Sequence, residues 1–266
     1  MDVIAPSPHP RSRSAHAMGF GFGFGRGGRG FKRVSSGGGG FDPTTLGPTE
    51  LCRADGSEYN GAPWAAEYGS GLNELTNPPP VSAAVNGYTG ADFDGTNDRL
   101  DTGDDFSGYV TATAGTILVL FNADTGATPS ASAYDDPSLV SDLLNCFNLG
   151  FTSSGLGLAF YDGVGWIEPT KVTCSTGALH VAMCRWNAST VEISVDGGTP
   201  SSIAHAGSLA IVSSAGYHFT VGHAEISAST FFDGKVYEVW AFNKRLTDTD
   251  IANYMTYVAA RYNHTF

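Results

Sequence analysis

Residues 178–198 read ALHVAMCRWNASTVEISVDGG. Between 190 and 196 the residues alternate strictly, so that valine and isoleucine fall on one face of an extended chain and glutamate, serine and aspartate on the other. The run ends in Asp-Gly-Gly at 196–198, a frequent signal for a β-hairpin turn. The apolar residues 178–187 precede it and are typical of a neighbouring strand. This stretch therefore predicts β-structure.

Further segments have the same β character, namely 116–124, 155–163, 217–224 and 235–244. Glycine, asparagine and aspartate turns separate these short runs, and a helical period is found only at 246–263. There Thr247 and Asp250 have the spacing of a capping box. Ile251, Tyr254, Met255 and Val258 form its apolar stripe. The pattern predicts an all-β antiparallel sandwich with one short C-terminal helix.

Four segments, in this chain order, resemble the laminin-G-like or concanavalin-A-like jelly roll. They are ELCRADGSEYNGAPWAAEYGSG (50–71), ADFDGTNDRLDTG (91–103), the stretch 178–198, and FFDGKVYEVWAFNKRLTDTDIANYMTYVAARY (231–262). The second is similar to the early strand Phe-x-Gly-x-x-Asp-x-Leu of that superfamily. The last is similar to its closing pattern of Phe-x-Gly, Glu-Val, an aromatic residue, Asn and Leu before a final helix. The resemblance covers about residues 50–263 and implies a jelly-roll fold.

Charge divides the chain in two. Residues 1–40 hold six basic side chains and one acidic side chain, a net +5, and the other 8 basic and 25 acidic residues leave −17 for residues 41–266. Within 1–40, GFGFGFGRGGRGFKR (19–33) has too little apolar volume to fold alone. We expect an extended arm at 1–40, a linker at 41–50 and a jelly-roll domain at 51–266.

The acidic body disfavours nucleic acid as a partner of the main domain, because phosphate contacts need clustered Lys and Arg. No apolar run is long enough to span a membrane, and no Sec-type apolar segment occurs in the first 30 residues. A jelly roll without a secretion signal resembles bacteriophage virion proteins, such as capsid decoration, head-fibre or tail proteins. These are made in the host cytoplasm and released by lysis.

In that interpretation the arm anchors the protein to other virion proteins in an oligomeric assembly. Its phenylalanines would fill small pockets, its glycine backbone could add to strand edges, and its basic residues would pair with acids. The expected anchor residues are Phe20, Phe22, Phe24, Arg26, Arg29, Phe31, Lys32 and Arg33.

Host polysaccharide is a second expected partner. A glycan site needs an exposed aromatic ring beside fixed polar groups, and FYDGVGW (160–166) offers Tyr161, Asp162 and Trp166 on a glycine-rich loop. Ordinary hairpin packing explains the same motif equally well. The alternatives to a virion protein are a cell-surface carbohydrate-binding adhesin or lectin module and, less favoured, a glucanase-like glycoside hydrolase.

We expect no enzymatic activity. A retaining glycosidase needs two carboxyl groups about 5 Å apart, and only Glu192 and Asp196 share a strand face here. Glu238 is expected to make a buried or edge hydrogen bond rather than to catalyse. His180 and His205 have no Ser or Cys partner in the sequence that suggests a nucleophilic triad.

No organic cofactor is expected. The jelly-roll resemblance implies calcium as the one candidate metal, with Asp101, Asp104 and Asp105, or the acids of AYDDP (133–137), as candidate ligands. Turn residues in contact with water are the favoured alternative for these acids. The four cysteines include no Cys-x-x-Cys pair, so we expect small buried side chains, with one disulfide as the alternative.

Overall fold

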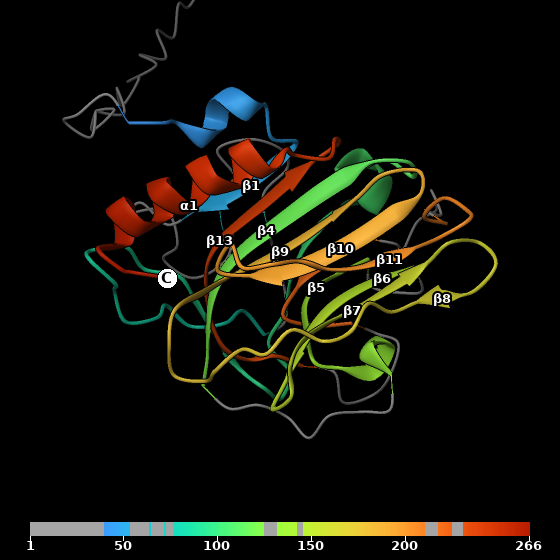
Figure 1. Ribbon diagram of the computed structural model, residues 1–266. Coiled ribbons are helices and arrows are strands. Elements are labelled where there is room, and N and C mark those ends of the chain that lie inside the picture. The colour runs from blue at the N-terminus through green and yellow to red at the C-terminus, as the bar shows by residue number, and fades with distance from the viewer. Residues whose placement is uncertain are drawn as a thin grey trace, which may run out of the picture. The chain divides into compact units, whose positions relative to one another are not determined.

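Two antiparallel sheets lie face to face in the computed structural model of the chain (Figure 1). The residues that the structure describes are 40–53, 64, 72, 77–124, 132–142, 146–210, 218–224 and 231–266. Of the arm expected at 1–40, residues 1–39 lie outside the described residues, and so do all the expected anchor residues. Gly40–Phe266 form one compact unit.

The first sheet has seven strands within the described residues, in the order β1-β13-β4-β9-β10-β11, and β2 also pairs with β13. These strands are β1 (Glu50–Arg53), β2 (Ala91–Asp94), β4 (Gly115–Ala123), β9 (His180–Trp186), β10 (Thr190–Val195), β11 (Ser201–Ala204) and β13 (Asp233–Phe242). The stretch 178–198 thus forms the pair β9–β10, in which Val191 lies opposite Trp186 and Val195 opposite Ala182. The strands predicted at 116–124, 178–187, 190–196 and 235–244 are confirmed.

The second sheet has six strands within the described residues, in the order β3-β12-β5-β6-β7-β8. They are β3 (Leu100–Asp105), β5 (Ser138–Ser141), β6 (Phe147–Thr152), β7 (Gly155–Tyr161), β8 (Trp166–Ile167) and β12 (His218–Val221). The described part of the chain also holds three short 3-10 helices, η1 (Pro43–Leu46), η2 (Phe106–Gly108) and η3 (Ala133–Asp135). The predicted all-β antiparallel sandwich is confirmed.

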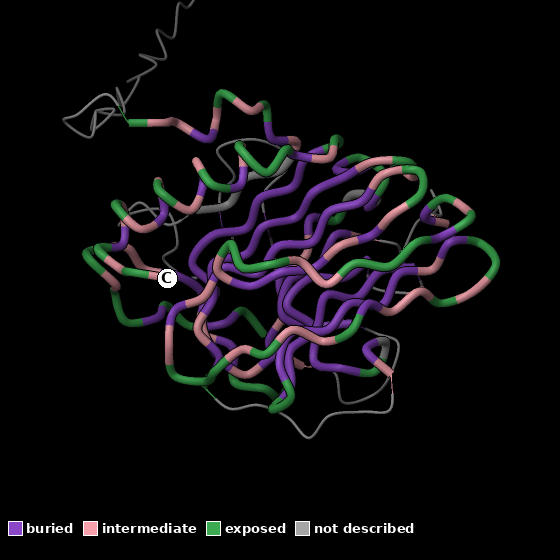
Figure 2. Tube along the Cα trace, viewed as in Figure 1, coloured by how far each residue is buried: buried purple, intermediate pink, exposed green. Residues whose placement is uncertain are grey.

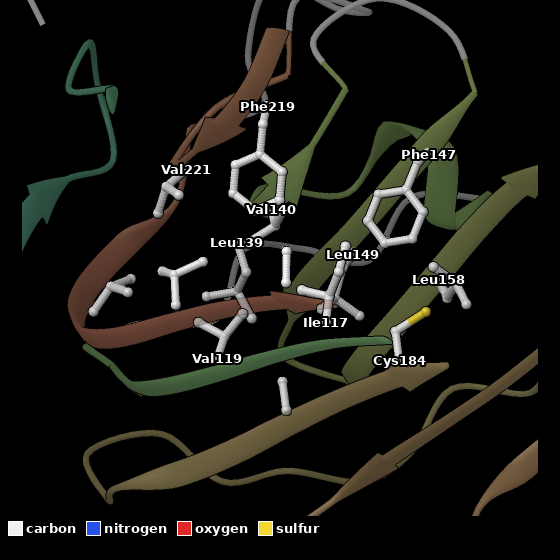
Figure 3. Close-up of a cluster of buried hydrophobic side chains, with 14 of the residues drawn as sticks. Ile117, Val119, Leu139, Val140, Phe147, Leu149, Leu158, Cys184, Phe219 and Val221 are labelled. Carbon is white, nitrogen blue, oxygen red and sulfur yellow. The ribbon is translucent and has the colours of Figure 1, made fainter. Parts of the chain in front are cut away.

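The main core fills the space between the two sheets. Ile117 and Val119 of β4 belong to this core together with Leu139 and Leu149 of the other sheet (Figure 3). Because successive side chains of a strand point to opposite faces, Leu118 of β4 belongs to a second cluster on the outer side. This explains why 116–124 is apolar almost throughout: the strand is buried on both faces (Figure 2).

The second cluster lies under the only α-helix of the described residues, α1 (Asp248–Tyr262). Thr247 is its N-cap and forms a capping box with Asp250, as the sequence predicts. Ile251, Tyr254 and Val258 of the predicted stripe are buried. Figure 1 shows the helix lying over β13 and β4 of the seven-stranded sheet.

A buried carboxylate links this helix to the sheet. Glu238 of β13 is fully buried and accepts hydrogen bonds from Trp240 Nε1 (2.8 Å), Tyr254 Oη (3.3 Å) and Tyr262 Oη (3.1 Å). Arg261 Nε lies 3.1 Å from Glu238 Oε1, the carboxylate oxygen that also accepts the hydrogen bond from Tyr262. The expectation that Glu238 makes a buried hydrogen bond is confirmed.

Residues 41–50, expected to be a linker, contact the sandwich. The 3-10 helix η1 lies against α1, and the Thr49 side chain donates a hydrogen bond of 3.0 Å to the carbonyl of Ala241. The described cysteines, Cys146, Cys174 and Cys184, are free thiols, of which the first and last are buried. Within the described residues no helix combines the length and the apolar character that crossing a membrane requires.

Candidate functional site

Tyr161 and Trp166 form a pair of aromatic rings at one end of the six-stranded sheet. They are register partners in β7 and β8, and their ring centroids lie 5.4 Å apart at 53°. The Trp166 ring is partly open to water, with 37% of the residue exposed, and Val164 at the loop tip is 85% exposed. The loop thus presents an apolar surface of the kind on which the CH faces of a sugar ring stack.

Asp162 holds this loop in shape. Its Oδ1 accepts hydrogen bonds from the backbone N–H groups of Val164 (2.9 Å) and Gly165 (3.0 Å), and only 6% of the residue is exposed. The same N–H groups, that of Gly165 foremost, lower the pKa of the carboxyl group below its usual value. Asp162 therefore positions the two aromatic rings and turns its carboxylate into the loop.

Neighbouring segments fix the base of the loop from both sides. The backbone N–H of Tyr161 donates to the carbonyl of Cys146 (2.8 Å). The carbonyl of Tyr161 accepts a hydrogen bond from the N–H of Ala210 (2.9 Å). A Cβ atom at Gly207 would lie 2.2 Å from the Asp162 carbonyl oxygen, so this close approach requires glycine. The aromatic pair is consequently presented on a rigid base.

The proposed calcium ligands are only partly described. Asp101 Oδ1 accepts a hydrogen bond from the Gly103 N–H (2.8 Å) within β3, while the side chains of Asp104 and Asp105 lie outside the described part. In AYDDP, Asp136 is buried and pairs with Lys171 at 2.6 Å. Within the described ranges no three His, Cys, Asp or Glu side chains gather as a metal site, and calcium binding stays a prediction.

The outer face of β9 and β10, beside α1, carries an open groove of about 680 Å³. Arg185 and Arg245 both bind Glu192 on this face, each at 2.8 Å. Burial opposes ionisation of Glu192, but the hydrogen bonds and charges of the two arginines outweigh it and lower the pKa of the carboxyl group. A glycosidase general acid needs a raised pKa, so Glu192 is not suited to that single role.

A third group of polar side chains lies near the end of this sheet. Ser175 Oγ is 2.8 Å from His180 Nε2, and His180 Nδ1 is 2.6 Å from Asp196 Oδ2. The expectation that His180 has no serine partner is wrong. Ser175, five positions before His180, contacts it across an irregular turn, and no periodic pattern in the sequence predicts this contact.

The position of Asp196 could have been inferred from the sequence. Pairing β9 with β10 about the turn at 187–189 places residue 196 opposite residue 181, which is next to His180. His205, by contrast, binds the carbonyl of Asn187 through Nε2 at 3.0 Å and packs against the Phe160 ring.

Comparisons with known proteins establish the fold. No protein-family model matches the chain, and no curated protein sequence matches it. Among solved structures, domain 4 of AbnA, a GH43 extracellular arabinanase from Geobacillus stearothermophilus solved with arabinotriose, is similar with a TM-score of 0.50 and 11% identity. That alignment covers 76% of this chain and 85% of the arabinanase domain.

Two further structures are similar over only part of their own length. Trypanosoma rangeli sialidase has a TM-score of 0.55 at 14% identity, covering 81% of this chain and 33% of the sialidase. The binding domain of Paraclostridial Mosquitocidal Protein 1 has a TM-score of 0.56 at 11% identity, covering 79% and 52%. At these identities the similarity shows a shared β-sandwich, jelly-roll-like fold.

Proposed function

We propose that this protein is a glycan-binding display module whose contact surface is the Trp166–Tyr161 pair. The observation that carries the proposal is a partly exposed tryptophan beside a second aromatic ring, on a loop that Asp162 and its backbone hydrogen bonds hold fixed. Binding then requires little ordering of the protein, which favours affinity for a flexible polysaccharide. One of the similar structures, the arabinanase domain, was solved with a trisaccharide bound, which is in keeping with this use of the fold.

Binding, rather than cleavage of glycosidic bonds, is the proposed role. Glu192 is tied to two arginines, and Glu238 lies under α1 with four partners. Neither carboxyl group is free to protonate a leaving sugar. A reducing-sugar assay on bacterial polysaccharides is expected to give no release above the buffer control.

Replacing Trp166 with Ala is expected to weaken glycan binding by about 5- to 150-fold in Kd, because a buried stacking contact contributes roughly 1–3 kcal/mol. Trp166→Phe should retain part of the affinity. The measurement is a glycan array followed by calorimetry on the glycan that binds best. Val81→Ala is the matched control. Val81 is similarly exposed (42%), and it forms a β-bridge with Ala91 of β2 in the other sheet, away from Trp166. Equal binding by the wild type and Trp166→Ala would contradict the site.

We place this module on a bacteriophage virion, as a decoration, head-fibre or tail protein that meets host polysaccharide. The arm at 1–40 carries +5 and the rest of the chain −17, so the two parts suit different partners. The arm can pair with acidic faces of neighbouring virion subunits through its arginines and fill pockets with its phenylalanines. The acidic part would then face outward and keep the particles soluble.

Deleting residues 1–39 is expected to leave the unfolding transition of the domain unchanged and to remove the protein from particles. The domain should persist because Gly40–Phe266 form one compact unit. Quantitative mass spectrometry of purified virions measures the copy number of each form. Full incorporation of the truncated form would contradict the anchor, and absence of the wild type from particles together with presence on a cell surface would favour an adhesin instead.

A further inference from the structure

Ser175, His180 and Asp196 have the relative geometry of a nucleophilic serine with its base and the group that orients the base. We infer that this group, here called the Ser175 site, reacts with carboxylic esters by acyl transfer through Ser175 Oγ. The inference is independent of glycan binding at Trp166 and goes beyond it, since it adds a reaction to a module that otherwise acts by contact.

The two hydrogen bonds define the role of each residue. When His180 Nδ1–H donates to Asp196 Oδ2 at 2.6 Å, the neutral ring presents the lone pair of Nε2 to the hydroxyl of Ser175 at 2.8 Å. This tautomer is the one in which a histidine can accept the serine proton as a general base. A nearby carboxylate also stabilises the imidazolium that forms when the proton arrives.

The sheet holds the base and its carboxylate in place. Asp196 follows β10 in a left-handed conformation (φ 55°), and its Oδ1 accepts a hydrogen bond of 2.8 Å from the backbone N–H of Val181. Its own N–H donates to the Val181 carbonyl at 2.9 Å. His180 is the first residue of β9, and 12% of its side chain is exposed. Base and carboxylate are therefore preorganised on a strand pair.

The nucleophile itself is accessible. Ser175 is exposed on the turn before β9, where an ester can approach without opening the fold. The adjacent thiol is not a competitor, because burial and the charge of Asp196 raise the pKa of Cys174 to about 12 and keep it protonated at neutral pH. Within the described chain, the backbone N–H groups of Thr176 and Ala178 make no hydrogen bond, so the turn has spare donors for a developing oxyanion.

The reaction would run in two halves, with an ester and water as the only reactants. Ser175 Oγ attacks the carbonyl carbon while its proton passes to His180 Nε2, and the tetrahedral adduct collapses with cleavage of the bond to the alcohol oxygen. The alcohol leaves with the proton from Nε2, and Ser175 remains acylated. Water then attacks the acyl carbon with Nε2 again accepting a proton, and the carboxylic acid and free Ser175 are released.

Because Ser175 lies on an exposed turn, little of a substrate would be held in place there, which favours small esters with good leaving groups over peptides. The probes are therefore a fluorophosphonate, which phosphonylates activated serines with loss of fluoride, and p-nitrophenyl acetate. We expect a single adduct on intact full-length protein, located on Ser175 by peptide mass spectrometry. We also expect p-nitrophenolate release above the buffer rate.

Three variants and one matched control separate catalysis from a structural clamp. Ser175→Ala and His180→Gln should lower the rates of fluorophosphonate labelling and of p-nitrophenyl acetate hydrolysis by about 100-fold or more, the usual contribution of general-base catalysis. Asp196→Asn should also lower both rates, although Ser175 is still present. Ser153→Ala is the control, because Ser153 is an exposed turn serine without a histidine partner among the described residues. It should react like the wild type.

Each outcome of these measurements either supports or overturns the inference. Loss of reactivity in Ser175→Ala, with an unfolding temperature equal to that of the Ser153→Ala control, supports the inference even if Asp196→Asn proves less stable. Wild-type labelling no faster than that of the urea-denatured chain would overturn the inference. So would an ester hydrolysis rate that Ser175→Ala leaves unchanged, because the three residues would then only clamp the turn to the sheet.

Discussion

Replacing Glu238 with Gln is expected to lower the free energy of unfolding by about 3–5 kcal/mol, the usual loss when one partner of a buried ion pair is removed. The carboxylate accepts from Trp240, Tyr254 and Tyr262 and pairs with Arg261. Burial raises the pKa of both tyrosines, and the charge of Glu238 adds to the effect, so their hydroxyls stay protonated donors. The amide would leave the Arg261 charge without its counterion and turn an N–H₂ group toward other donors.

Urea unfolding followed by tryptophan fluorescence and by far-UV circular dichroism measures this loss. Asp135→Asn is the matched control, because Asp135 is exposed on η3 and its side chain makes no hydrogen bond within the described residues; its effect should stay within about 0.5 kcal/mol. A Glu238→Gln protein as stable as this control would show that the hydrogen bonds of the carboxylate do not hold α1 on the sheet.

Trp186→Ala is expected to destabilise the domain by a similar amount, about 3–5 kcal/mol. The indole is fully buried between the sheets and contacts the rings of Phe147 and Phe160. Its Nε1–H donates to the carbonyl of Thr111 at 3.0 Å. A Cβ atom at Gly115 would lie 2.2 Å from Cζ2 of the indole, so the ring lies directly on the backbone of β4. Truncation would leave a cavity lined by rigid strands, which cannot collapse to fill it.

Trp166→Ala provides the matched comparison, since it is the same chemical change at a partly exposed position. It should cost less than about 1 kcal/mol, because 37% of the residue is already exposed to solvent at the edge of the sheet, whereas Trp186 is fully buried. Chemical denaturation of both variants in parallel measures the difference. Similar losses at the two positions would mean that Trp166 is a packing residue, and its assignment to a glycan surface would fail with that result.

Much of the fold can be predicted from local patterns. The alternation at 190–196, the apolar run at 116–124 and the capping box at Thr247 each predict an element that the structure confirms, because each reports the environment of its own segment. β5 and β6 were not predicted. The outward positions of β6, such as Asn148 and Gly150, hold small or polar residues that are nevertheless buried, because η3 and the residues after it lie directly on this face.

The candidate sites are harder to predict from the sequence than the strands and the helix are. The motif at 160–166 predicts an aromatic loop, but only the hydrogen bonds from Val164 and Gly165 show that Asp162 faces inward. The Ser175 site depends on a turn with neither helical nor strand periodicity, so the sequence does not predict where Ser175 lies. Its third member, Asp196, could have been placed from strand pairing alone.

The sequence by itself determined the strand pattern, the helix and the division of charge between a basic stretch at 1–40 and an acidic remainder, because hydrophobic periodicity and charge are properties of neighbouring residues. Only the tertiary structure decided which polar side chains meet. Asp196 reaches His180 through the pairing of β9 with β10, and Glu238 reaches Tyr254 and Arg261 because α1 packs across β13. Such contacts join residues far apart in the chain, and the packing of strands and helix fixes their distances.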